Sequence, residues 1–282
     1  MGHHERISIG RINYTNVWPI FHHFPEDRFA GEVLFSLQVP TGLNRAMAAG
    51  EVDMGAMSSF AYGANFDDYM LFPGLSVSAL GRVNSLLLFH REPLEKIAGG
   101  TFALSTASAT TVNLLKILLS KRFGANPTYI SMAPSLEAMM AAADGALLIG
   151  DDAIRASWAD HGYMVTDLGE LWKEFTGEWM TFAVWAVRKD TIRRNPQLVS
   201  RIHEAFQWSK EHGLRHPEGM IAKAQATIGG TEAYWRGYFS QLTYEFGPDQ
   251  WRGLSLYFRY AKELGLLERD VPIQIWEELP AK

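Results

Sequence analysis

Strand-like and helix-like segments alternate over short distances in the first part of this sequence. Apolar, β-rich segments at residues 7–12, 33–39 and 52–57 are separated by short helical pieces. An order of strand, helix and strand is typical of a parallel sheet with helices packed against it. The pattern therefore predicts an α/β fold.

Two longer extended runs interrupt this alternation. They are Ser85–His90 and Thr181–Arg188, and a second alternating set lies between them. This order is expected when a chain crosses to a second lobe and later returns. We predict one lobe from residues 1–88 plus 186–282, a second lobe from residues 89–185, and a ligand cleft between them.

The pattern changes after Asp190. Apolar residues at positions 198, 199, 202 and 206 share one face of a helix, and helical periodicity continues to about residue 266. We therefore predict a mostly helical C-terminal region that contains no internal repeat.

Composition narrows the class of protein. The 282 residues are 47% hydrophobic and 20% charged, which is typical of a soluble globular chain. The net charge is −5 and no long Lys/Arg run occurs, so we expect no nucleic-acid partner. Apolar runs are too short to span a bilayer, and the N-terminal residues do not resemble a secretory signal. We expect a cytoplasmic protein.

The sequence has few features of metal or cofactor sites. It contains no Cys, which excludes thiolate ligands and a Cys nucleophile. It also lacks the spacings of a P-loop, a dinucleotide fingerprint, a zinc-protease helix and a nucleophile elbow. The adjacent pair His22-His23 would point in different directions on a helix. We expect neither a metal nor an organic cofactor.

Three junctions between a strand and a helix are rich in Ser, Thr and Asn. They are Asn13–Asn16, Ser58-Ser59 and Ser105–Thr111. Hydroxyls, amides and free backbone N–H groups at a helix start bind carboxylates and other anions well. In a parallel sheet such junctions lie at the carboxyl ends of the strands, where ligands bind. Each junction alone is also explained by helix N-capping. Three such junctions, distributed over two lobes that face one cleft, predict a small anionic ligand instead.

Asp151 and Asp152 follow a short apolar strand. One interpretation is a further helix N-cap, for which Asp is favoured. The other is a carboxylate at the edge of the cleft that positions a substrate hydroxyl. The residues alone leave both interpretations open.

Several segments resemble a known family, the chorismate dehydratases of the futalosine route to menaquinone. The similar segments include IGRINYTNVWPIF, VPTGLNRAMAAGEVDMGAMSSFAY, SLLLFHREPLEKIAG, ALSTASATTVNLLKILL, ALLIGDDAI and DLGELWKEFTGEWMTFAVWAVRKD. They occur in order from about residue 6 to residue 190. In this chain Asn16 and Ser85 are kept, while Asn84 stands where a glycine is frequent.

The resemblance implies the two-lobed fold of type II periplasmic binding proteins with a helical C-terminal region. It also implies a hydro-lyase that converts chorismate to 3-[(1-carboxyvinyl)oxy]benzoate and water, without a metal or cofactor. A sister family that makes 1,4-dihydroxy-6-naphthoate uses a His base after the strand that matches Ala146–Ile149. That position is Gly150 here, which favours the dehydratase.

The reaction removes the C3 proton and the C4 hydroxyl of a dianion. We predict that Asn16 and Ser85 are catalytic and hold the ring hydroxyl or a carboxylate. The base is either the substrate's own enolpyruvyl carboxylate, which we favour because it adds no enzyme charge beside a dianion, or Asp151. The predicted substrate-binding residues are Ser58, Ser59, Ser108, Ala109, Thr110, Thr111 and Asp151.

Two alternatives remain at this point. The chain is either the sister naphthoate synthase or a cytosolic binding module for small anions without catalysis, since such sites look alike. The sequence does not indicate an oligomeric state.

Overall fold

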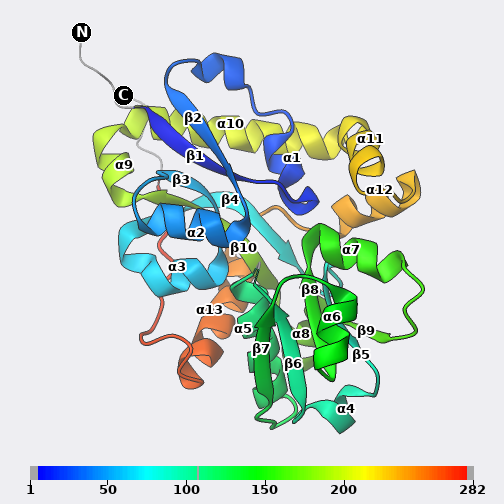
Figure 1. The fold of residues 1–282 in the computed structure, drawn as a ribbon. Coiled ribbons are helices and arrows are strands. Elements are labelled where there is room, and N and C mark those ends of the chain that lie inside the picture. Colours follow the sequence, from blue (N-terminus) through cyan, green and yellow to red (C-terminus); the bar gives the residue numbers. More distant parts are fainter. Residues whose placement is uncertain (1–5, 107, 278–282) are drawn as a thin grey trace.

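The structure is a computed structural model that describes residues 6–106 and 108–277. His3, His4 and Ala107 lie outside the described residues. Two five-stranded sheets form the centres of the two halves of the molecule, which lie one above the other in Figure 1. The predicted α/β fold is therefore confirmed.

The first sheet has the strand order β2-β1-β3-β10-β4. Its strands are β1 (Ile7–Ile12), β2 (Val33–Gln38), β3 (Met54–Ser58), β4 (Tyr69–Ala79) and β10 (Met180–Arg188). β1 pairs in parallel with β2 and β3, as the alternating pattern predicts. β10 enters antiparallel between β3 and β4, which are not direct neighbours.

The second sheet repeats this plan with the order β7-β6-β8-β5-β9. Its strands are β5 (Leu86–His90), β6 (Thr101–Ser105), β7 (Thr128–Met132), β8 (Gly145–Ile149) and β9 (Met164–Asp167). β6 pairs in parallel with β7 and β8, and β5 is antiparallel to β8 and β9. Each sheet thus holds one strand that runs against its neighbours.

Helices cover both sheets. Those before the C-terminal region are α1 (Trp18–Phe21), α2 (Pro40–Ala48), α3 (Ser59–Asn65), α4 (Leu94–Ile97), α5 (Thr110–Lys121), α6 (Leu136–Ala142), α7 (Gly150–Trp158) and α8 (Leu168–Thr176). Short 3₁₀ turns occur at η1 (Thr15–Val17), η2 (Glu26–Phe29) and η3 (Phe66–Asp68). The helix α5 forms because its Leu and Ile side chains recur at helical spacing and are buried.

The C-terminal region is helical, as predicted. It consists of α9 (Lys189–Arg194), α10 (Pro196–Arg215), α11 (Glu218–Thr227), α12 (Glu232–Gln241) and α13 (Pro248–Glu263). In Figure 1, α10 lies along the upper half, while α11 and α12 reach down toward α7. The backbone returns to the first sheet at Thr243, which bridges to Ser78.

The chain passes between the sheets twice. β4 ends at Ala79 and β5 begins at Leu86, so residues 80–85 form the first crossing; residues 177–179, between α8 and β10, form the second. The runs expected to cross, 85–90 and 181–188, lie largely within β5 and β10. The lobe boundaries given above remain a prediction. Among the described residues, no helix has the length and apolarity needed to span a membrane.

Candidate active site

The junction after β1 contacts the start of α7 across the two halves. The backbone N–H and the hydroxyl of Thr15 donate hydrogen bonds to Oδ1 of Asp151, at 3.3 and 2.6 Å. Burial raises the pKa of Asp151, and the two bonds from Thr15 oppose this shift. The N-cap of α7 is Ile149, so the capping interpretation of Asp151 is wrong. Its carboxylate joins the two halves instead.

Asn16 follows Thr15 within η1. Its Oδ1 atom is buried and accepts no hydrogen bond from the described residues. A buried amide oxygen without a donor is costly, and such atoms are uncommon in a native fold. A substrate hydroxyl is a donor that would satisfy it. This geometry is compatible with the role predicted for Asn16.

Ser85 ends the first crossing and is buried. Its hydroxyl accepts a hydrogen bond from the phenol of Tyr238 at 3.1 Å, and among the described residues its own proton has only the carbonyl of Val83 as acceptor, at 3.5 Å. That second distance is at the outer limit of a hydrogen bond. The Ser85 carbonyl accepts the N–H of Gly150 at 2.7 Å. Ser85 is therefore adjacent to the junction that carries Asp151.

The backbone just before Ser85 is held in an unusual conformation. Asn84 has φ of 60°, and among the described residues it is the only one other than Gly with a positive φ. Asn tolerates this left-handed region better than most residues. The Asp167 carboxylate accepts the N–H groups of Val83 and Asn84 at 2.9 and 2.7 Å. A glycine at position 84 would adopt the same left-handed conformation freely.

Ser58 and Ser59 lie at the start of α3. The Ser58 hydroxyl caps the helix by accepting the N–H of Ala61, and it also accepts a bond from Asn44 at 3.1 Å. The Ser59 hydroxyl is fully buried and donates to the carbonyl of Thr181 at 2.8 Å. Both hydroxyls thus have structural partners, which fits capping and packing as well as ligand binding.

The junction before α5 meets the start of α3. The hydroxyl of Thr110 accepts the N–H of Phe60 at 3.0 Å, and that of Ser108 accepts the N–H of Thr111 at 3.1 Å. Ala109 is the N-cap residue of α5. The structure therefore brings the predicted junctions together in pairs, the first with Asp151 and the second with the third.

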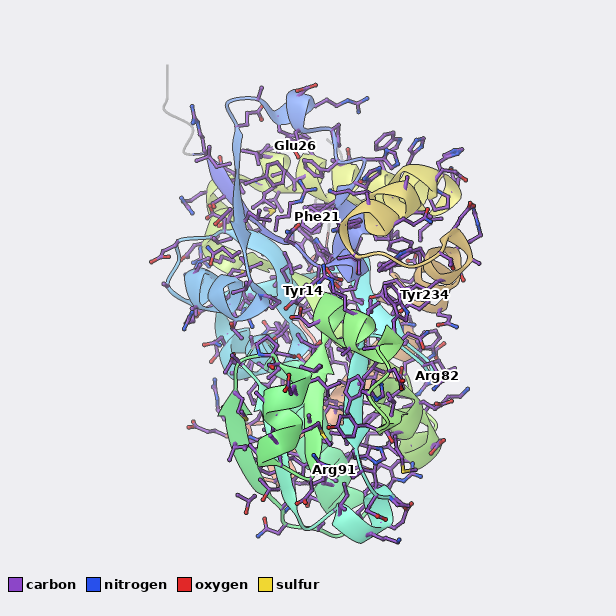
Figure 2. All side chains as sticks on the ribbon, turned by 45° about the vertical axis from the view of Figure 1, so that its right-hand side comes forward. Tyr14, Phe21, Glu26, Arg82, Arg91 and Tyr234 are labelled. Atoms are coloured by element: carbon purple, nitrogen blue, oxygen red, sulfur yellow. The ribbon has the colours of Figure 1, made fainter. Side chains whose placement is uncertain are left out.

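Gly150 packs against the ring of Tyr14. Its φ is 59°, and a Cβ at this position would lie 3.1 Å from the ring of Tyr14. Burial raises the pKa of Tyr14 to about 12, so the phenol stays neutral. Figure 2 shows Tyr14 near α7, at the level where the two halves meet. A side chain at position 150 has little room in this arrangement.

The C-terminal helices supply two buried phenols that sequence reasoning missed. Tyr238 of α12 donates to Ser85, and Tyr257 of α13 donates to the carbonyl of Thr110 at 3.1 Å. Both occur at helical spacing among other apolar residues, so the sequence pattern did not separate them from ordinary core residues. The helical region therefore fixes two of the predicted site residues.

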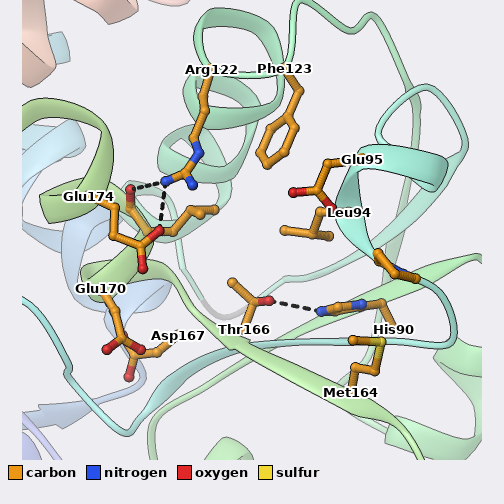
Figure 3. Close-up of a pocket in the computed structure, with 12 residues that line it drawn as sticks. His90, Leu94, Glu95, Arg122, Phe123, Met164, Thr166, Asp167, Glu170 and Glu174 are labelled. Carbon is orange, nitrogen blue, oxygen red and sulfur yellow. Dashed lines mark hydrogen bonds and ion pairs between the residues drawn. The ribbon is translucent and has the colours of Figure 1, made fainter.

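One cavity adjoins these contacts, and another lies away from them. One of about 470 Å³ is lined by Tyr14, Asp151, Arg155 and Lys223 among others, so it adjoins the Thr15–Asp151 contact. The other, of about 270 Å³, lies in the second half and is drawn in Figure 3. There the His90 ring bonds Thr166 at 2.9 Å. None of the predicted site residues lines this second cavity.

Comparison with known proteins identifies the family. The profile of a family described as menaquinone biosynthesis matches residues 7–263. A chorismate dehydratase of Thermus thermophilus is 40% identical over 273 residues, which cover 92% of this chain and 95% of that protein. The chain belongs to the menaquinone biosynthesis family. The predicted family is thereby confirmed.

Solved structures show the fold of this menaquinone biosynthesis family member. An Archaeoglobus fulgidus protein superposes with a TM-score of 0.72 at 17% identity, over 94% of this chain and all of that chain. The periplasmic aliphatic sulphonate binding protein SsuA of Escherichia coli superposes with a TM-score of 0.72 at 16% identity. The superposition covers 99% of this chain and 94% of that chain. The predicted periplasmic-binding-protein-like fold is confirmed.

Proposed function

We propose that this chain is a chorismate dehydratase, a carbon–oxygen hydro-lyase that forms 3-[(1-carboxyvinyl)oxy]benzoate and water. The observation that carries the proposal is the 40% identity to the Thermus thermophilus enzyme over almost the whole of both chains. The inter-lobe site supports it, because the site combines an unpartnered amide oxygen at Asn16 with a serine hydroxyl at position 85.

The reaction needs position more than a strong enzyme acid or base. Loss of the C3 proton and the C4 hydroxyl makes the ring aromatic, so the overall step is strongly downhill. Asn16 and Ser85 are neutral groups that bond a hydroxyl or carboxylate without adding charge beside a dianion. We infer that they orient the ring, while Ser58, Ser59 and the 108–111 segment face the carboxylates.

The proton acceptor that we favour is the substrate's own enolpyruvyl carboxylate. Asp151 is the alternative, but its Oδ1 atom already accepts two hydrogen bonds from Thr15. An enzyme carboxylate beside a dianionic substrate also meets like-charge repulsion. Asp151 is better suited to hold the turn that carries Asn16. Its proposed contribution to substrate binding is therefore through that turn.

Access to this buried site requires the two lobes to separate. Ser85 is 1% exposed and Thr15 is fully buried, and we infer that substrate reaches Ser85 when the Thr15–Asp151 contact opens. We infer that the lobes rotate about the two crossings, as such hinges need only a few residues. We further place the reaction in the cytoplasm, in the futalosine route to menaquinone.

The test is incubation of the purified chain with chorismate, followed by chromatography and mass measurement of an aromatic product. Formation of 3-[(1-carboxyvinyl)oxy]benzoate supports the proposal. Binding of chorismate without turnover identifies a binding module instead. Turnover of cyclic dehypoxanthine futalosine identifies the sister naphthoate synthase and overturns the proposal.

A further inference from the structure

Tyr238 lies in the interior of the candidate site although it belongs to the C-terminal helical region. It is 2% exposed, and α12 presents it beside Tyr234, whose ring stacks on it with centroids 6.3 Å apart. Its phenol donates to the hydroxyl of Ser85 at 3.1 Å. A helix that follows the first crossing by about 150 positions thus contacts the last residue of that crossing.

The phenol remains a donor under ordinary conditions. Burial raises the pKa of Tyr238 most, the hydrogen bond with Ser85 lowers it, the charge of Asp151 raises it, and the hydroxyl of Thr15 lowers it by a smaller amount. A neutral phenol has one proton to give, and that proton is directed at the Ser85 oxygen. The Ser85 oxygen therefore acts as an acceptor toward Tyr238.

This arrangement fixes which way the serine proton points. With one lone pair of Ser85 occupied by Tyr238, the serine proton turns toward another acceptor. Its present acceptor, the Val83 carbonyl, is 3.5 Å away and weak. A substrate oxygen at normal hydrogen-bond distance would replace it readily.

We propose that Tyr238 is a positioning residue that holds the Ser85 hydroxyl as a hydrogen-bond donor toward the substrate. This inference rests on the proposed function and on the role of Ser85 in it. Tyr238 itself does not touch the reacting atoms; it acts through Ser85. The proposal therefore makes the effects of the two residues interdependent.

The experiment is a double-mutant cycle of Ser85→Ala and Tyr238→Phe, measured as kcat/KM for chorismate. Tyr238→Phe keeps the ring and removes one neutral hydrogen bond, so kcat/KM should fall about 3- to 10-fold. In the Ser85→Ala background the same change should have almost no further effect, because the group that Tyr238 positions is absent.

A matched control separates this role from a general need for buried phenols. Tyr244 is also buried, and its hydroxyl makes no hydrogen bond with the described residues. Tyr244→Phe should therefore keep kcat/KM at the wild-type level. Fluorotyrosine at position 238 retains the hydroxyl and should retain turnover close to wild type. If Tyr238→Phe does not fold, the cycle is run with fluorotyrosine, whose altered donor strength should change kcat/KM only when Ser85 is present.

The outcomes are distinct. Losses from Tyr238→Phe and Ser85→Ala that multiply in the double variant overturn the proposal, because they assign Tyr238 an independent structural role. Wild-type kcat/KM in folded Tyr238→Phe overturns it as well. No turnover of chorismate by the wild-type chain means instead that the proposed function has failed, which the cycle distinguishes from failure of Tyr238.

Discussion

The hydroxyl of Thr15 donates a 2.6 Å hydrogen bond to the carboxylate of Asp151, 136 positions further along the chain. Thr15 follows β1 of the first sheet, whereas Asp151 begins the helix after β8 of the second. Together with the bond from the Thr15 backbone N–H, it joins the two halves of the molecule beside Asn16. The turn that carries Asn16 is therefore held by a residue of the other half.

Asn16→Asp should lower turnover more than any neutral change at this position. The substitution keeps an acceptor oxygen but replaces the amide N–H donor by an anion, which loses the bond from Asn16 to a substrate carboxylate and adds repulsion toward a dianionic substrate. Losing a charge-assisted hydrogen bond costs about 1.5–3 kcal/mol, or about 10- to 150-fold in kcat/KM, before repulsion is counted. Steady-state kinetics with chorismate measure it.

The control for this variant is Asn126→Asp, which adds the same charge on an exposed loop of the second lobe. It should keep normal kinetics. If Asn16→Asp lowers only the melting temperature, and the folded protein turns over normally, Asn16 is a structural residue and leaves the proposed site.

Gly150→His should not create naphthoate synthase activity. Residue 150 has φ of 59°, where a side chain costs about 1–2 kcal/mol, and its Cβ would meet the Tyr14 ring at 3.1 Å. The Tyr14 ring must shift to admit the new side chain, so we expect the imidazole to be poorly placed to reach a substrate proton. Chromatography with cyclic dehypoxanthine futalosine checks this prediction.

Gly162→His separates the two causes, because Gly162 has a similar φ of 66° but a Cβ added there would meet no atom within 4 Å. It should lose less stability than Gly150→His. Naphthoate formation by Gly150→His would show instead that the two sites are nearly interchangeable.

Ionisation of the buried Asp151 should lower the free energy of unfolding as pH rises above 3.8. Its pKa in the folded chain is raised above 3.8 by burial, so the folded state binds more protons than the unfolded state between 3.8 and the raised value. The free energy of unfolding therefore falls as pH increases through this window. Asp151→Asn should remove this contribution and flatten the profile.

Thr15→Val keeps the Asp151 carboxylate but removes the hydroxyl that bonds it. The hydrogen bonds from Thr15 lower the pKa of Asp151, so loss of the hydroxyl should raise that pKa and extend the destabilisation to higher pH. Urea denaturation at a series of pH values measures both variants. If the free energy of unfolding depends on pH in the same way in Thr15→Val and the wild type, the contact between Thr15 and Asp151 is contradicted.

Asn84→Gly should be tolerated better than Asn84→Ala. The left-handed backbone at this residue costs a side chain such as Ala about 1 kcal/mol, while Gly adopts it freely. Both variants lose the contact between the Asn84 amide and Gln241. The difference between their free energies of unfolding therefore reports the cost of the left-handed backbone. Chemical denaturation provides the measurement, and equal stability of the two variants would refute the interpretation.

Local patterns were sufficient for most of the fold. The strand at residues 7–12 and the helices after Asp190 occur as predicted, because burial and periodicity act within each segment. The antiparallel insertion of β10 between β3 and β4 was not predicted, because pairing depends on contacts across more than 100 positions. The lobe boundaries and the site residues remain predictions.

The candidate site was harder to predict for the same reason. Ser and Asn at strand ends are visible in the sequence, but the partner of Ser85 is a tyrosine 153 positions away. A buried Tyr on a helix has the same periodicity as a core Phe, so only its hydrogen bond distinguishes it. Asp151 likewise resembles an N-cap until Thr15 is seen beside it.

The place of β10 in the first sheet has a consequence for synthesis on the ribosome. Because β10 separates β3 from β4, that sheet is incomplete until residue 188 has been made. The second sheet is continuous between residues 86 and 167 and has all its strands before then. The nascent chain can thus fold its second lobe while β4 still lacks its neighbour, and the first lobe closes around β10 afterwards.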